Sequence, residues 1–244
     1  MTIFGKEIIH LTTVDSTNKY AAKLVSDQIH KTGTVILADS QTNGKGQRGN
    51  SWLSEPCKNL LFTLIYTPDS LSALHQSKLN WLTSISLVKT LGKFNIEAKI
   101  KWPNDIFVHR KKIAGILIEN QLLGENIHCS LIGIGMNVNQ QNFGELVATS
   151  IYNELNQFLS REILLHKIID QMNEEFQKLT RSGNYDIKSE YESMLFQINE
   201  TGFYEDHDGQ FEGEIIGVKT NGFLLVKVNG EIREYGIKEI RYWN

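Results

Sequence analysis

TVILADSQTNGKGQRGNSWLSEPCKNLLFTLIY, residues 34–66, joins two apolar, strand-like runs through a glycine-rich loop. In this loop Gly44, Gly46 and Gly49 satisfy the dinucleotide fingerprint G-x-G-x-x-G, and Asn50 stands where a P-loop would carry its phosphate-binding lysine. Both of those loops must open a helix, whose N-terminus then meets the phosphates. Here the next element is the strand-like run LLFTLIY, so the sequence predicts neither a Rossmann fold nor a P-loop.

The loop carries its own cations, Lys45 and Arg48, in place of a helix dipole. Glycines let the backbone approach a ligand closely, and the two side chains would supply positive charge for an anion. A flexible surface loop with ordinary solvated charges is the alternative. This stretch alone leaves both interpretations open.

The segments around the loop carry both strand and helix patterns. Glu7–Val14 reads as a strand, and Asp15 or Ser16 can cap a helix through NKYAAKLVSD. From Leu71 to Phe94, apolar residues recur at helical spacing and predict one long core-facing helix. IKWPNDIFV, KIAGILIENQLL and IHCSLIGIGMNV then read as strands joined by short polar turns. We therefore predict an α+β fold with a mainly antiparallel or mixed sheet and packed helices.

After Asn139 the pattern changes to helices, predicted at Ile151–Leu159, at Glu162–Arg181 and within YDIKSEYESML. From Thr201 onward only short strands remain.

Two Asn-Gly dipeptides in this tail, at residues 221–222 and 229–230, favour type I′ hairpins, in which both central residues need positive φ. The tail therefore reads as a small β-barrel-like module. We predict two domains, residues 1–195 and 196–244.

Composition and charge narrow the class of protein. The chain has 244 residues, a formal net charge of -3 and a pI of about 6.2, so no overall basic field favours nucleic acid as a partner. Its two cysteines, Cys57 and Cys129, have no metal-ligand spacing and make no disulfide framework. Neither a signal-peptide pattern nor an apolar run of bilayer length is seen, so we predict a cytoplasmic protein with no membrane partner.

KWPNDIFVHRKKIAGILIE, residues 101–119, holds two lysines of interest. Lys101 lies between apolar neighbours at a strand end, which favours a role in neutralising charge, although a surface lysine is the alternative. Lys112 invites the same interpretation. Gly115, within a strand, indicates that a ligand or a backbone comes close.

IGIGMNVN, residues 132–139, places Gly133 and Gly135 two residues apart on one strand, so two side chains are missing from the same face. A flat ligand could lie there, with Asn137 at the strand end. Tight packing of a helix is the alternative.

Four motifs in this order resemble one family, the biotin protein ligases, along most of residues 1–140. They are DSTN (15–18), the glycine loop with Gln41 before it and Trp52 after it, KWPND followed by K-x-A-G-I-L-x-E, and G-x-G-x-N. The resemblance implies a class II synthetase-like catalytic domain followed by a small SH3-like β-barrel. The DNA-binding domain of the repressor members has no counterpart in the match, so a monofunctional form is expected.

The resemblance implies a reaction in two steps. The carboxylate of biotin attacks the α-phosphorus of ATP, giving biotinyl-5′-AMP and pyrophosphate, with Mg²⁺ bridging the phosphates. A lysine of a biotin carboxyl carrier protein, or of the carrier domain of a biotin-dependent carboxylase, then takes the biotinyl group and releases AMP. Because two anions must meet, catalysis is expected to depend on positioning and on fixed cations.

The matched motifs also imply the site residues. The catalytic group is Lys101, Arg48 and Lys45. The biotin-binding group is Ser16, Thr17, Asn18, Gln41, Gly44, Lys45, Gly46, Gln47, Lys101, Gly115, Gly133 and Gly135. The ATP-binding group is Arg48, Trp52, Asn104, Lys112 and Asn137. The metal ligands stay open, with a position near Asn137 and help from Asp105 or Glu119 as hypotheses.

The loop departs from the family pattern G-R-G-R-x-G, because Lys45 replaces its first arginine and Gln47 its second. Glutamine has no cationic fork. We predict that Arg48, at the variable position, takes over that role, and a looser hold on the intermediate is the alternative.

The nearest rival is a lipoate-protein ligase or octanoyltransferase of the related fold. Octanoyltransferases use a cysteine thiolate, which makes Cys57 worth testing, although an incidental cysteine is the interpretation we prefer. A DNA-binding biotin sensor and a plain carrier-binding scaffold are the non-enzymatic rivals. Either a monomer or a homodimer is compatible with the sequence.

Overall fold

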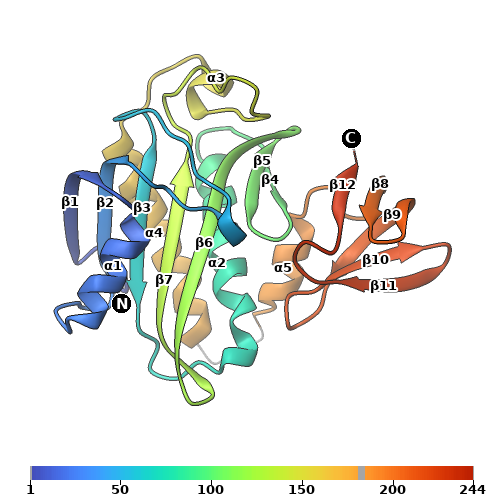
Figure 1. Cartoon of the computed structure of the whole chain (residues 1–244), viewed down its shortest axis with the longest axis horizontal. Helices are drawn as coiled ribbons and strands as arrows, with labels where there is room; N and C mark the ends of the chain where they lie inside the picture. The colour runs from blue at the N-terminus through green and yellow to red at the C-terminus, as the bar shows by residue number, and fades with distance from the viewer. Residues whose placement is uncertain (1, 181–184, 244) are drawn as a thin grey trace.

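The computed structural model describes residues 2–180 and 185–243, and a seven-stranded sheet organises most of it (Figure 1). The sheet order is β1-β2-β3-β7-β6-β5-β4. In that order the strands span Glu7–Val14, Thr34–Gln41, Leu60–Tyr66, Asn126–Met136, Lys111–Leu123, Asp105–Val108 and Ala98–Lys101. β1 and β2 are parallel and the other neighbours are antiparallel. The predicted α+β class with a mainly antiparallel sheet is confirmed.

Helices cover both faces of this sheet (Figure 1). α1 (Thr17–Ser26) connects the parallel pair and packs on one face, where Ala21 and Val25 meet Ile36 and Ile65. α2 (Ser77–Gly92) and α4 (Arg161–Thr180) pack on the other face and against each other. Because both faces are covered, all seven residues of β3 are buried, as its apolar sequence predicts.

The long helix predicted over Leu71–Phe94 begins only at Ser77. The preceding residues pair instead with the hairpin between β6 and β7, where Ala73 N donates to Glu125 O at 2.9 Å. A 3₁₀ turn, η2 (Ala73–His75), follows, and the Ser72 hydroxyl caps it. Tertiary hydrogen bonds therefore override the apolar periodicity at this end.

Two short helices complete the larger part of the chain. α3 (Ile151–Leu155) is shorter than predicted, because Asn156 adopts the left-handed conformation with φ of 52° and ends it. α5 (Ile187–Ser193) lies in the predicted segment YDIKSEYESML. Arg181, the predicted end of the long helix, lies outside the described residues. No helix in the described part of the chain is both long and apolar enough to cross a membrane.

The C-terminal tail forms a second, five-stranded antiparallel sheet in the order β11-β10-β9-β8-β12. From β8 to β12 the strands span Thr201–Asp206, Gly209–Val218, Leu224–Val228, Glu231–Tyr235 and Arg241–Trp243. The small C-terminal β-module is confirmed. Among the described residues its sheet is open, with β11 and β12 as the edge strands.

The two Asn-Gly turns of this module differ. Asn229 and Gly230 both have positive φ, 51° and 88°, as type I′ requires. At the other turn only Gly222 does, with φ of 91°, so the prediction of type I′ at Asn221-Gly222 is wrong.

The C-terminal module, residues 196–243, is joined to the larger sheet by direct hydrogen bonds. The linker pairs with the edge strand β4, because Ile100 N donates to Met194 O and Phe196 N donates to Ile100 O, both at 2.8 Å. Trp102 Nε1 also donates to Gly222 O at 3.0 Å. These contacts hold the module beside the β4–β5 turn and form one wall of a cleft.

Candidate active site

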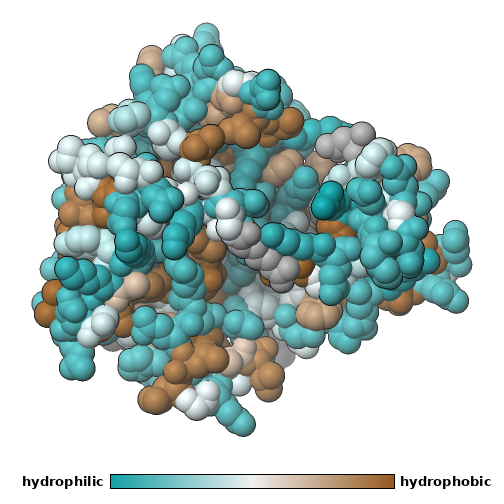
Figure 2. Space-filling view, in the orientation of Figure 1, coloured by the Kyte–Doolittle hydropathy of each residue, from teal (hydrophilic) through white to brown (hydrophobic). Residues whose placement is uncertain are grey.

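A cavity of about 600 Å³ lies between β6 and β7, the glycine loop, the β4–β5 turn and the C-terminal module. Hydrophilic residues border this hollow in the space-filling view (Figure 2). The structure brings fourteen of the predicted site residues together in its lining: Ser16, Thr17, Asn18, Gln41, Lys45, Gly46, Gln47, Trp52, Lys101, Asn104, Lys112, Gly115, Gly133 and Gly135.

A chain of hydrogen bonds joins the start of α1 to three strands. Gln41 Oε1 accepts from Thr17 N at 2.7 Å, and Thr63 Oγ1 lies 2.8 Å from Thr17 Oγ1 and donates to Asn18 Oδ1 at 2.6 Å. Asn18 Nδ2 in turn donates to Glu119 Oε2 at 2.7 Å. Both ends of the Asn18 amide are thus engaged within the protein.

The groups in this region that are left for a ligand belong to Gln41 and Ser16. Within the described residues, neither Gln41 Nε2 nor the Ser16 hydroxyl makes a hydrogen bond, and both residues line the cavity. An amide donor and a hydroxyl at one end of the cavity suit a small ligand that carries both donors and an acceptor.

Thr63 was missed by the sequence analysis. It is fully buried in β3, between apolar neighbours, and one hydroxyl in an otherwise apolar strand was the signal that could have identified it.

The bare glycine positions are filled by protein side chains. A Cβ on Gly133 would lie 2.3 Å from Asn18 Oδ1, and a Cβ on Gly135 would lie 2.5 Å from the indole of Trp52. Gly115 also faces that indole, at 3.1 Å. These glycines admit the first turn of α1 and the tryptophan that ends the glycine loop, which favours the alternative of tight packing; that a flat ligand lies on them stays a prediction.

The glycine loop forms a small hairpin. Trp52 N donates to Gly44 O at 2.9 Å, and Gly46 N donates to Asn50 O at 2.7 Å. Gly44 does not line the cavity, because its bare face meets the backbone of Trp52, and its contact with biotin stays a prediction. A 3₁₀ turn, η1 (Gln47–Gly49), forms the tip of the hairpin.

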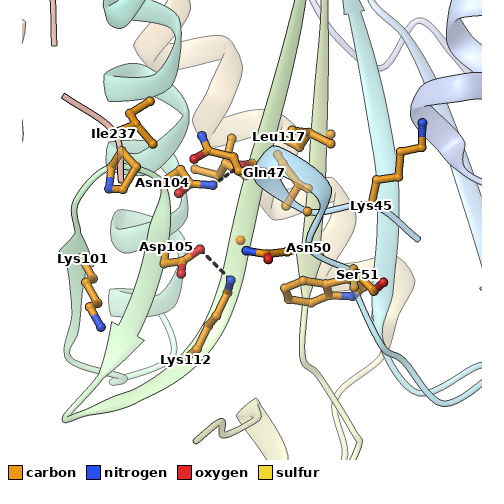
Figure 3. Close-up of a pocket in the computed structure, with 18 of the residues that line it drawn as sticks. Lys45, Gln47, Asn50, Ser51, Lys101, Asn104, Asp105, Lys112, Leu117 and Ile237 are labelled. Carbon is orange, nitrogen blue, oxygen red and sulfur yellow. Dashed lines mark hydrogen bonds and ion pairs between the residues drawn. The ribbon is translucent and has the colours of Figure 1, made fainter. Parts of the chain in front are cut away.

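Three features of this loop bear on its predicted cations. Figure 3 shows Lys45 directed away from Lys101 and Lys112. Gln47 reaches the cavity from the tip. The side chain of Arg48 lies outside the described part of the structure, so its predicted role stays a prediction.

The two lysines on the opposite side have different partners (Figure 3). Lys112 Nζ forms an ion pair with Asp105 Oδ1 at 2.7 Å and lies 5.4 Å from the ring centre of Trp52. Lys101 Nζ lies 4.6 Å from the ring centre of Phe107 and 4.7 Å from that of Tyr242. Burial lowers the pKa of Lys101 below its ordinary value; the nearby charge of Asp105 opposes this in part, and the charge of Lys112 adds a smaller lowering.

The two predicted asparagines have structural hydrogen bonds. Asn104 lines the cavity, and its Nδ2 donates to Ile116 O at 2.5 Å, which fixes the β4–β5 turn against β6. Asn137 does not line the cavity; its Nδ2 donates to Thr149 O at 2.9 Å. In the structure this amide anchors the segment before α3, and the position of Asn137 near the nucleotide and the metal stays a prediction.

The C-terminal module contributes residues that the sequence analysis did not predict. Ile237, Lys238, Ile240, Arg241 and Tyr242 all line the cavity. They add two cationic side chains to those of Lys101 and Lys112. No local motif marks them, because their place depends on how the two sheets dock.

Comparisons with known proteins agree with this arrangement. The profile described as "Biotin/lipoate A/B protein ligase family" matches residues 11–137. The bifunctional ligase/repressor BirA of Bacillus subtilis is 30% identical over 238 residues, which cover 95% of this chain and 73% of that protein. The biotin–[acetyl-CoA-carboxylase] ligase of Paracoccus denitrificans is 35% identical over 132 residues, which cover 52% of this chain and 53% of that protein.

A solved structure is similar over the whole length. The biotin protein ligase of Aquifex aeolicus, in complex with biotin and ATP, superposes with a TM-score of 0.81 and 27% identity. The match covers 98% of this chain and 100% of that one.

Proposed function

The chain belongs to the biotin/lipoate A/B protein ligase family, and on that basis we propose that it is an ATP-dependent biotin protein ligase. It activates biotin as biotinyl-5′-AMP with release of pyrophosphate, and then transfers biotin to a lysine of a carrier protein. The observation that carries the proposal is the convergence of all four motif segments on one cavity bordered by lysines.

Biotin, in this proposal, lies with its ureido ring at the Gln41 end of the cavity. The free Nε2 of Gln41 donates to the ureido oxygen, and the Ser16 hydroxyl meets a ring N–H. Thr63 and Asn18 do not bind the ring themselves. Their hydrogen bonds hold the start of α1, and so Ser16 and Thr17, in place.

The first chemical step joins two anions, so it needs fixed positive charge where the phosphorus gains a fifth ligand. We assign that role to Lys101, whose ammonium has no carboxylate within ion-pair distance among the described residues. Lys112 releases Asp105 and turns to the phosphates. Partial exclusion of water strengthens each of these interactions and protects the mixed anhydride from hydrolysis.

The residues present suit Mg²⁺ held mainly by the nucleotide. Asp105 is the one carboxylate among the described lining residues, and Mg²⁺ commonly keeps several waters and binds one or two carboxylates together with substrate phosphates. We propose Asp105 as its protein ligand, in place of Asn137. When bound, the ion supplies charge neutralisation at the phosphates.

The glycine loop, on this proposal, closes over the intermediate. Trp52 anchors one end of the loop on β6 and β7, near Gly115 and Gly135, and its indole N–H has no partner among the described residues. The ring either stacks on the adenine or only orders the loop. Arg48 supplies the loop charge that Gln47 lacks.

The octanoyltransferase alternative, which needs a cysteine thiolate, finds no support in the two cysteines. Neither cysteine lines the cavity: Cys57 is exposed beyond the loop, and burial raises the pKa of Cys129 to about 11. A thiolate nucleophile is therefore not at hand. The relatives from Paracoccus denitrificans and Aquifex aeolicus are also named as biotin ligases.

The remaining assignments are proposals as well. The acceptor is the carrier domain of a biotin-dependent carboxylase. The enzyme is a cytoplasmic monomer or homodimer. Residues 1–195 and 196–244 form two domains, but catalysis and carrier recognition are only partly divided between them, because both domains line the cavity.

The test is biotin-dependent exchange of labelled pyrophosphate into ATP, followed by transfer to a carrier domain, with lipoate in a parallel reaction. Exchange with biotin, and none with lipoate, is expected. Exchange driven by lipoate, or none with either acid, would contradict the proposal.

A further inference from the structure

Two aromatic rings from different modules enclose the ammonium of Lys101. Phe107 belongs to β5, the hairpin partner of the strand that ends at Lys101, and its ring centre is 4.6 Å from Nζ. Tyr242 belongs to β12 of the C-terminal sheet, and its ring centre is 4.7 Å from Nζ. Both distances lie within the range of about 6 Å in which a cation is attracted to an aromatic face.

Aromatic faces hold a lysine differently from a carboxylate. The ion pair with Asp105 takes up a donor of Lys112 and offsets its charge. A ring attracts the ammonium through its quadrupole but brings no negative unit charge and no strong acceptor. Lys101 is therefore held in place while its N–H donors stay free for an arriving anion.

Tyr242 is itself held by other rings. Its ring centre is 5.5 Å from that of Tyr204 and 6.0 Å from that of Phe196, which also packs 6.0 Å from Phe107. This cluster fixes the ring of Tyr242 above Lys101 from the side of the C-terminal module.

We propose that Tyr242 is a positioning residue for adenylation: its ring, with that of Phe107, holds the Lys101 ammonium where the two anions meet. This inference rests on the proposed function. It means that the C-terminal sheet completes the site for the first chemical step, besides any part it has in binding the carrier. Burial lowers the pKa of Lys101, which agrees with a site that Tyr242 shields from water.

The kinetic test compares three variants in biotin-dependent pyrophosphate exchange. Tyr242→Leu removes the aromatic face, Tyr242→Phe keeps it, and Trp243→Leu makes the same change one residue along β12 at a side chain that does not line the cavity. We expect kcat of Tyr242→Leu to fall about tenfold, with both KM values within about twofold, because positioning acts on the transition state. Tyr242→Phe and Trp243→Leu are expected to match the wild type.

A second readout is independent of activity. Lys101 Hε protons, observed by NMR in lysine-labelled protein and assigned with Lys101→Arg, are expected to be shifted upfield by the two ring currents. The shift should shrink in Tyr242→Leu and persist in Tyr242→Phe.

Three outcomes would overturn the inference: unchanged kcat in Tyr242→Leu, an equal loss in Tyr242→Phe or Trp243→Leu, or a Lys101 signal that does not respond to Tyr242→Leu. Absence of exchange in the wild type would count against the proposed function alone, since the NMR shift still decides whether Tyr242 holds Lys101.

Discussion

Adding one methyl group at Gly135 should loosen the glycine loop while leaving most of the fold intact. A Cβ there would lie 2.5 Å from Cε2 of Trp52 and 2.8 Å from Cδ2 and Cζ2, whereas ordinary contact begins at 3.4 Å. The φ of Gly135 lies outside the left-handed region, so the backbone itself accepts alanine. The indole must therefore retreat by about 1 Å.

The cost of that retreat is divided between stability and function. Overpacking a buried position destabilises by about 1–3 kcal/mol, and we expect the lower end because Trp52 closes a hairpin loop that can shift. That corresponds to a decrease in Tm of about 2–4 °C for a chain of this size. Displacement of a site wall by about 1 Å can cost about 100-fold in rate, so the retention of the intermediate should fall much more than the Tm.

The assay is the rate at which labelled biotinyl-5′-AMP leaves the enzyme, measured beside thermal melting. Gly133→Ala is the comparison. Its Cβ would lie 2.3 Å from Asn18 Oδ1, an atom fixed by hydrogen bonds, so the Tm should fall further than in Gly135→Ala. Gly92→Ala is the control, because nothing lies within 4 Å of its Cβ. If Gly135→Ala holds the intermediate as the wild type does, or melts as early as Gly133→Ala, the argument about Trp52 is refuted.

Three other substitutions test separate parts of the account. Thr63→Val removes the hydroxyl that satisfies Asn18 and should raise the KM for biotin about tenfold; an unchanged KM would contradict the network. Lys101→Met should abolish exchange yet raise the Tm at neutral pH by about 2 °C, because burial lowers the pKa of Lys101 and so makes its charged form costly in the folded state. That cost is lost as the pH rises through the lowered pKa towards the ordinary lysine value of 10.5, and a lower Tm at neutral pH would refute this. Burial favours a raised pKa for Glu175, but hydrogen bonds from Lys178 and a second lysine hold it below its ordinary value of 4.5. Glu175→Gln should therefore destabilise by about 3 kcal/mol at pH 7, with the difference from wild type shrinking as the pH falls below 4.5, measured by urea titration at each pH.

The residues of the site that the sequence predicts are those whose chemistry is local. Lys101 was identified because a charge among apolar neighbours needs a reason, and the glycine loop because no helix follows it. Both observations concern adjacent residues. The order of the motifs then placed them in one family, and the sheet brings them to one cavity.

What the sequence did not predict depends on contacts between distant segments. Gly133 and Gly135 correctly indicated a close approach, but only the packing shows that Asn18 and Trp52 make it. Tyr242 reaches the cavity through the docking of a second sheet, for which an isolated RYW segment contains no signal. Asn137 fits the family motif, and yet its amide is directed to Thr149 O, 2.9 Å away.

In the proposed mechanism, the different partners of Lys101 and Lys112 explain how a chain of net charge -3 can gather two anionic substrates. The charge of Lys112 is offset by Asp105 until a phosphate replaces that carboxylate. Binding of the phosphate by Lys112 therefore exchanges one ion pair for another. Lys101 lies against two aromatic faces and forms no ion pair among the described residues, so most of the cost of desolvating its ammonium arises when the protein folds and not when the anions arrive. A site with two carboxylate-paired lysines would bind nucleotide but would have to reorganise both pairs before the chemical step. In the proposed mechanism, the lysine held by rings keeps its charge ready for the chemical step, while the charge of the lysine paired with Asp105 stays neutralised until the nucleotide binds.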